Sequence, residues 1–169
     1  AFFGLAGPAI GNRRWMAAAR PAVAGQFVFV ALSFAVLAWA FYKNDFSVLY
    51  VAQNSNSALP TPYRFAAVWG AHEGSLLLWV LILCLWIAAV ARFSENLPDH
   101  VLARVLSVMG MVAFGFLAFT VITSNPFERL LPAAIEGHDL NPLLQDPGLI
   151  FHPPLLYIGY VGFSVAFAF

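Results

Sequence analysis

Long stretches of apolar residues alternate with short polar segments along this chain. Residues 22–42 and 105–124 contain no Asp, Glu, Lys or Arg, and each has about the 20 residues that an α-helix needs to cross a bilayer. Residues 72–91 and 153–169 form two further stretches, while residues 1–11, at about 1.5 Å per residue, cover only half a bilayer. The pattern predicts an all-α fold, a polytopic transmembrane helical bundle of about four to five spans, with the first and last spans incomplete. We therefore expect a piece of a longer membrane protein.

The composition agrees with a membrane protein and excludes several other classes. Hydrophobic residues make up 62% of the chain and charged residues only 9%, whereas soluble domains carry about 25% charged residues. The formal net charge is zero, so nothing indicates a nucleic-acid partner, and membrane lipid is the expected partner of the apolar surface. The single cysteine, Cys84, lies inside an apolar stretch. This excludes a disulfide framework, a zinc site of paired cysteines and a Cys-x-x-Cys-His haem-attachment site.

The charged residues predict how the chain is oriented in the membrane. Segments 12–21 and 92–104 hold five basic and two acidic residues, whereas segments 43–73 and 125–152 hold three basic and six acidic residues. Loops rich in Lys and Arg stay on the cytoplasmic side. Loops 43–71 and 125–152 are therefore expected on the outer side of the membrane. The second of these is rich in Asn-Pro and Asp-Pro turns, which predicts an ordered but mostly irregular loop.

The sequence Phe151-His152-Pro153-Pro154 is the sharpest candidate for chemistry. Proline is favoured in the first turn of a helix, so the pattern places His152 at the N-terminus of the last span, at the outer membrane surface. There the positive end of the helix dipole favours a neutral imidazole, the state that binds a metal or a haem iron. Tyr157 follows one to two turns below. The alternative is an interfacial histidine in an aromatic belt, and these residues alone leave both interpretations open.

A second candidate is the pair His72-Glu73. A zinc protease needs a second histidine four residues after the first, and position 76 is leucine. One interpretation is a helix start, with Glu73 at the positive dipole end and the neighbouring glycines allowing close packing. The other is a proton or ligand path formed by a buried His–Glu pair. A third polar group, residues 136–139, is typical of a turn and lacks the calcium-loop pattern.

A resemblance to a known family lies in three runs, WGAHEGSLLLWVLILCLW, TSNPFERLLPAAIEGHDLNPLLQDPGLIFHPPLLY and GYVGFSVAFAF. They resemble the N-terminal part of CcmF, the membrane haem lyase subunit of bacterial cytochrome c maturation. NrfE, a paralogue that serves nitrite-reductase cytochromes, is also similar. The resemblance covers nearly the whole chain and is strongest from Tyr50 to Phe169. It implies a multi-pass protein of the bacterial inner (cytoplasmic) membrane whose functional loops are periplasmic.

The resemblance also implies a cofactor and site residues. His152 matches the first of two outward histidines that ligate iron in the CcmF family, so the implied cofactor is haem b (iron protoporphyrin IX), with His152 as an axial ligand. Arg64 and Arg129 are guanidiniums suited to the haem propionates, Tyr157 is implied to lie near the haem, and His72 is a further candidate. The family's tryptophan-rich haem motif, its second outward histidine and its intramembrane pair of haem ligands have no counterpart in this sequence.

The implied function is to hold haem at the periplasmic membrane face for covalent attachment to apocytochrome c. The implied partners are a periplasmic haem chaperone, apocytochrome c and other cytochrome c maturation subunits. No residue is assigned a catalytic role, because the reacting thiols belong to the apocytochrome. Lyase activity is expected of the full-length protein and not of this stretch alone.

Two other functions stay open. A haem transporter would need polar, cavity-facing residues within its spans, and the uncharged residues 22–42 and 105–124 argue against it. A non-catalytic docking scaffold would bind the maturation subunits through its outer loops without binding haem. Haem titration with and without His152 separates this scaffold from a haem-binding protein.

Overall fold

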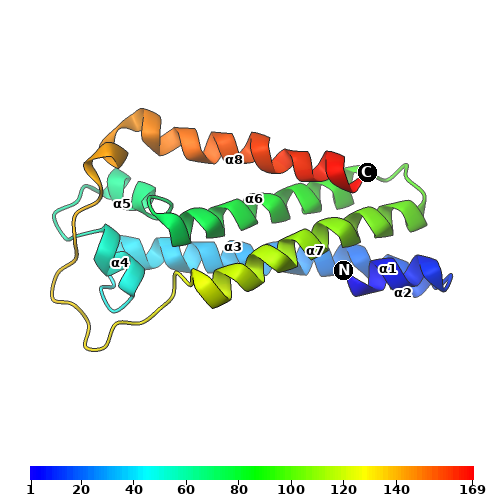
Figure 1. The fold of residues 1–169 in the computed structure, drawn as a ribbon, viewed down its shortest axis with the longest axis horizontal. Helices are drawn as coiled ribbons and strands as arrows, with labels where there is room; N and C mark the ends of the chain where they lie inside the picture. Colours follow the sequence, from blue (N-terminus) through cyan, green and yellow to red (C-terminus); the bar gives the residue numbers. More distant parts are fainter. The chain divides into compact units, whose positions relative to one another are not determined.

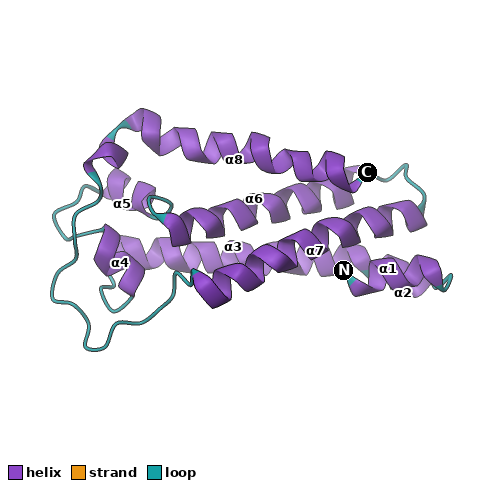
Figure 2. Ribbon diagram, in the orientation of Figure 1, coloured by secondary structure: helices purple, strands orange, loops and turns teal.

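The long elements of the computed structural model are all helices (Figures 1 and 2), and the structure describes residues 1–169 apart from the side chains of Phe3 and Leu149. In chain order the helices are α1 (Phe2–Ala9), α2 (Arg13–Ala17), α3 (Ala19–Lys43), α4 (Leu49–Asn54), α5 (Thr61–Ala67), α6 (His72–Phe93), α7 (Asp99–Thr123), the 3-10 helix η1 (Pro142–Gln145) and α8 (Pro147–Ala168). Among the described residues, β-type pairing is limited to one isolated bridge between Val48 and Arg129.

Within the described part of the chain, four helical segments are long and apolar enough to cross a membrane. They are Arg13–Lys43, His72–Phe93, Asp99–Thr123 and Ile150–Ala168, which contain 31, 22, 25 and 19 residues. A span needs about 20 residues, within a range of about 17 to 25, so these segments confirm the predicted all-α multi-pass membrane fold. Helix α1 has only 8 residues and is too short to cross a bilayer by itself.

Two helices begin earlier than the apolar stretches suggest. Helix α7 begins at Asp99 and not at residue 105, because the amides of Val101 and Leu102 both bond to the carbonyl of Pro98. Helix α8 begins at Pro147 and not at residue 153. An uncharged stretch measures the thickness of the apolar membrane core, and a helix can continue beyond it into the interface.

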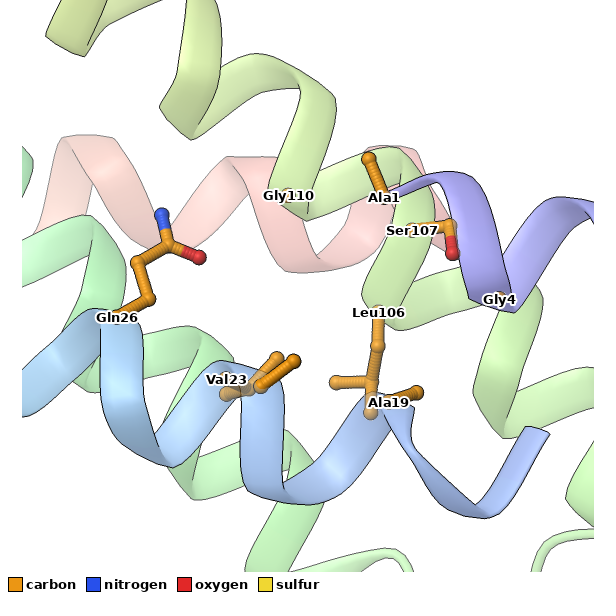
Figure 3. Close-up of a pocket in the computed structure, with 9 residues that line it drawn as sticks. Ala1, Gly4, Ala19, Val23, Gln26, Leu106, Ser107 and Gly110 are labelled. Carbon is orange, nitrogen blue, oxygen red and sulfur yellow. The ribbon is translucent and has the colours of Figure 1, made fainter. Parts of the chain in front are cut away.

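The chain divides into two compact units. The first contains Ala1–Ala31, Val80–Ala118 and Tyr157–Phe169. Its fully buried side chains come from α6, α7 and α8 and include Leu83, Ile87, Met109 and Val161. Helix α1 lies very close to α7, since a β-carbon on Gly4 would be 2.0 Å from the Ser107 hydroxyl. Beside this contact is a pocket of about 210 Å³ (Figure 3), whose polar lining side chains are Gln26 and Ser107.

The second unit contains Leu32–Trp79 and Phe119–Leu156, and both predicted outer loops belong to it. Its core combines the end of α3 with side chains from α4, from the segment before α6 and from the loop after α7. The fully or almost fully buried members are Leu37, Phe41, Tyr50, Val51, Val68 and Leu140. The rings of Phe41 and Tyr50 meet edge-on, with centroids 5.4 Å apart. All five candidate site residues except Tyr157 lie in this unit.

Candidate functional site

The two outer loops are bonded directly to each other. The Leu49 amide donates to the Glu128 carbonyl over 2.9 Å, and the Leu130 amide donates to the Ser47 carbonyl over 2.8 Å. Further along, the His138 amide donates to the Ala52 carbonyl over 2.7 Å. The segment between α7 and η1 is therefore bonded to α4 and to the residues just before it at two places, residues 128–130 and His138. The loop is ordered, as its turn-rich sequence predicts.

Arg129 takes part in this loop contact with its side chain as well as its backbone. Its Nη1 donates to the Ser47 hydroxyl over 2.6 Å and to an Asp45 carboxylate oxygen over 3.3 Å. The hydrogen bond from Ser47 and, to a smaller extent, the charge of Arg129 lower the pKa of the Asp45 carboxyl. Asp45 therefore stays ionised, and it neutralises much of the charge that Arg129 would present to an anion.

Arg64 bonds mainly to its own loop. Its Nε donates to the Leu59 carbonyl and its Nη2 to the Ser57 carbonyl, both over 2.8 Å. The Ser57 hydroxyl and amide in turn donate to the Glu136 carboxylate, which holds the pKa of Glu136 below its ordinary value. A guanidinium has five N–H donors, so Arg64 keeps donors beyond the two that its loop uses.

Tyr50 fixes the start of α6. Its hydroxyl donates to the Val68 carbonyl over 3.2 Å and accepts from the Ala71 amide over 3.2 Å. Burial raises the pKa of this phenol, so it stays protonated and keeps its donor. A β-carbon on Gly74 would lie 1.7 Å from the Val68 carbonyl oxygen. The close approach that glycine allows here agrees with the helix-start interpretation of the His72-Glu73 segment.

His72 is the first residue of α6 and contacts the end of α7. Its Nε2 lies 3.0 Å from the Ser124 hydroxyl, and the backbone of Ser124 in turn bonds to Thr120. The ring therefore has a polar partner within the protein. This contact explains the position of His72 without a bound ligand. The other ring nitrogen, Nδ1, takes no part in it.

His152 occupies the second turn of α8, which corrects the predicted position at the helix N-terminus. The helix starts earlier because Asp146 caps it: its carboxylate accepts from the Gly148 amide over 2.8 Å, and Pro147 takes the first position. The dipole of a helix acts mainly within its first turn, so its effect on His152 is smaller than predicted. The side chain is exposed, and within the described residues no hydrogen bond or ion pair reaches it.

Two prolines follow His152 inside the helix, and another group replaces the donor that one of them lacks. Pro154 has no amide hydrogen, so it leaves the carbonyl of Ile150 without its helical partner. The indole Nε1 of Trp69 donates to this carbonyl over 3.1 Å. No local sequence pattern pairs Trp69 with a residue 81 positions away. Trp69 holds the turn of α8 that carries His152.

Replacing Trp69 with phenylalanine should loosen this turn of α8. The carbonyl of Ile150 would lose its donor at a cost of about 1 kcal/mol, so hydrogen exchange at the Phe151 and His152 amides should become about fivefold faster. Trp86→Phe is the matched control. The Trp86 indole donates over 3.0 Å to the carbonyl of Ile158, and that carbonyl also has a helical amide partner. Equal exchange rates in Trp69→Phe and in the unchanged protein would contradict the bond's role.

The remaining candidate, Tyr157, does not share a helix face with His152. Residues five apart on an α-helix are about 140° apart around its axis. Leu155 and Leu156, three and four positions on, do lie below His152, and both are exposed. Their spacing of three and four positions from His152 could have identified them from the sequence. Within the described part of the chain, no hydrogen bond or ion pair links His152 to His72 or to either arginine. The described residues also contain no group of three or more His, Cys, Asp or Glu side chains that could hold a metal ion.

Comparison with known proteins gives a consistent result. Residues 69–169 match the family described as cytochrome C assembly protein. The CcmF proteins of Pseudomonas aeruginosa and Escherichia coli (strain K12), each named as a cytochrome c-type biogenesis protein, are 66% and 63% identical over 98% of this chain. The NrfE protein of Haemophilus influenzae is 55% identical over 81% of it.

A solved structure has the same fold. The chain titled "Cytochrome c Heme Lyase CcmF" matches 98% of this chain with a TM-score of 0.84 and 30% identity. This chain spans about a quarter of the length of these relatives: 25% and 26% of the two CcmF proteins, 22% of the NrfE protein and 26% of the solved chain.

Proposed function

Since the chain belongs to the cytochrome c assembly protein family, we propose that it holds haem at the outer membrane face for covalent attachment to apocytochrome c. In this proposal it works as part of a haem lyase in the bacterial inner membrane, with its loops in the periplasm. The partners would be a periplasmic haem chaperone, apocytochrome c and other maturation subunits. The identity with CcmF proteins and the likeness to a solved haem lyase support the proposal.

The observation that carries the proposal is the state of His152. An exposed imidazole with no polar partner among the described residues is available to a metal, whereas His72 already has a hydroxyl at 3.0 Å. Exposed apolar side chains surround His152, with Phe151 next to it and Leu155 and Leu156 on the same face. An imidazole beside an apolar surface suits the iron and the apolar ring of haem b.

In this proposal the chain contributes binding and orientation. Haem, when bound, would supply the vinyl groups that combine with the cysteine thiols of the apocytochrome. His152 would hold the iron, and Phe151 and Leu155 would keep water from the ring. Fixing two reactants in position can lower a barrier by about 7 to 11 kcal/mol, so an orienting role is sufficient and no catalytic side chain is needed from this chain.

The other candidates take smaller parts in the proposal. Arg64 and Arg129 would meet haem propionates through the N–H donors that their loop contacts leave over. Their first role is to hold the outer loops together. His72 would set the start of α6, and Tyr157, on another face of α8, would not cover the haem held by His152.

The periplasmic position of the loops can be tested by labelling. Ala58 and Ala133 are exposed in the second unit, and Asn96 is exposed between α6 and α7. In spheroplasts carrying the full-length protein, Ala58→Cys and Ala133→Cys should react with an impermeant maleimide, whereas Asn96→Cys should react only after lysis. Cys84, the one cysteine of these 169 residues, is buried, and the full-length protein without an added cysteine gives the background. Labelling of Asn96→Cys in intact spheroplasts would reverse the orientation.

The test of the proposal is a change of ligand at His152. The full-length protein in nanodiscs should bind added haem with the spectrum of an imidazole-ligated iron. His152→Cys offers a thiolate in place of the imidazole, so the Soret band of the carbon monoxide complex should move strongly to longer wavelength. A non-catalytic scaffold would bind no haem in either form. Haem binding with the same spectrum in both forms would show that position 152 does not ligate the iron.

A further inference from the structure

The loop after α7 exposes a short apolar segment, residues 131–135, which we call the apolar tip. Leu131 is 84% exposed, and Ile135 is fully exposed. Pro132 and Ala133 between them are also exposed. No charged residue interrupts the tip. A contiguous exposed apolar segment indicates a surface that meets another molecule.

The apolar tip is held at both ends. Before it, the Leu130 amide bonds to the Ser47 carbonyl. After it, the Glu136 carboxylate accepts from the Ser57 hydroxyl and amide, over 2.6 and 2.9 Å. A β-carbon on Gly137 would lie 2.0 Å from the Ser55 carbonyl oxygen, so the chain directly after the tip is tightly packed. The tip is therefore presented on a fixed base.

Two apolar residues of the same loop, one on each side of the tip, are buried. Pro126 precedes the tip and is fully buried, and Leu140, which follows it, is 1% exposed. The loop thus has a core in which to bury apolar side chains, and yet Leu131 and Ile135 remain outside it. The exposed tip therefore lies between two buried residues of the same loop.

The surroundings of the tip are acidic. Segment 125–146 contains four acidic residues and one basic residue. Glu128, Glu136 and Asp139 are exposed on either side of the tip, while the basic Arg129 pairs with Asp45. Acidic side chains repel the headgroups of anionic lipids and attract basic groups. The acidic rim therefore favours a basic polypeptide over a membrane surface.

We propose that the apolar tip and its acidic rim are a docking surface for a basic polypeptide that has not yet folded. Folded proteins bury most large apolar side chains, whereas an unfolded chain offers them along its length. The proposal rests on the function proposed above, in which the substrate is a cytochrome polypeptide that still lacks its haem. Leu131 and Ile135 contact its apolar side chains, and the rim attracts its lysines.

The experiment uses the full-length protein in nanodiscs of zwitterionic phosphatidylcholine, with Ala133→Cys carrying an environment-sensitive fluorophore. The probe is a purified, haem-free cytochrome c polypeptide. Its binding should be saturable and should weaken at least about tenfold when Leu131→Ser and Ile135→Ser are combined, because burial of such side chains accounts for that factor. Leu143→Ser, at a 70% exposed leucine in η1 outside the tip, is the matched control and should leave the affinity unchanged.

Two comparisons decide the outcome. The same polypeptide with succinylated lysines should bind at least about tenfold more weakly, because the rim then repels it. Unchanged affinity in the serine double variant, or for the succinylated probe, would overturn the proposal. If the fluorophore reports an apolar environment before any polypeptide is added, and brominated lipids quench it, then the tip lies in the membrane and the proposal is overturned. The haem spectrum is measured separately, so loss of haem binding tests the proposed function and not this surface.

Discussion

Replacing Gly74 with alanine should greatly reduce the amount of folded protein. The added β-carbon would lie 1.7 Å from the Val68 carbonyl oxygen and 2.6 Å from the Tyr50 hydroxyl. The first of these is a backbone atom in a buried turn and cannot move aside without separating α6 from the segment before it. Such overpacking typically costs about 1 to 3 kcal/mol. The full-length variant should accumulate in membranes severalfold less and should be cleaved faster by added protease.

Two companion variants make this result specific. Gly25→Ala adds the same atom within α3, where nothing lies within 4 Å, and should leave the amount of protein unchanged. Combining Gly74→Ala with Tyr50→Phe removes the hydroxyl contact but leaves the Val68 carbonyl in place, so it should not restore folding. Normal accumulation of the single variant would mean that the turn before α6 is looser than the structure has it.

Replacing His152 with alanine should lower the yield of c-type cytochromes by roughly tenfold or more, without lowering the amount of the protein itself. The first effect follows from the loss of an iron ligand. The second follows from exposure, because the imidazole has no hydrogen bond to lose within the described residues. Yield is measured by haem staining of membranes from a strain in which the full-length variant is the only copy.

Free imidazole should restore part of the yield in His152→Ala, since it can occupy the vacant ligand position. His72→Ala is the comparison at a second outer histidine, and its effect should be smaller because His72 bonds to Ser124. A normal yield in His152→Ala would leave an interfacial histidine in an aromatic belt as the better description. A larger loss of cytochrome yield in His72→Ala than in His152→Ala, at normal protein levels, would place the iron ligand at the start of α6.

Some parts of this structure follow from local sequence. Helix α6 begins at His72 as expected, because Glu73 and the nearby glycine suit a helix start. The start of α8 was missed although its signal is present: Asp146 followed by Pro147 obeys the same rule that was applied to Pro153. Two competing start signals lie within one segment, and the cap at Asp146 decides between them.

The contacts that hold the candidate site could not be predicted from one sequence. Arg129 and Asp45 are separated by 84 positions, and Trp69 and Ile150 by 81. Which outward arginine is paired, and which carbonyl receives an indole, depends on how the two outer loops pack. From the sequence, Arg64 and Arg129 therefore looked free for propionates, although both are bonded within the loops.

The bond between Trp69 and Ile150 also has an optical consequence. It fixes an indole against the backbone only two residues before His152. Indole emission overlaps the strong absorption of haem, so the fluorescence of Trp69 would be quenched by energy transfer to haem bound at His152. The protein thus carries its own reporter of occupancy beside the proposed ligand. Arrival and departure of haem can then be followed in time without an added label, with the Trp69→Phe variant giving the background from the remaining tryptophans.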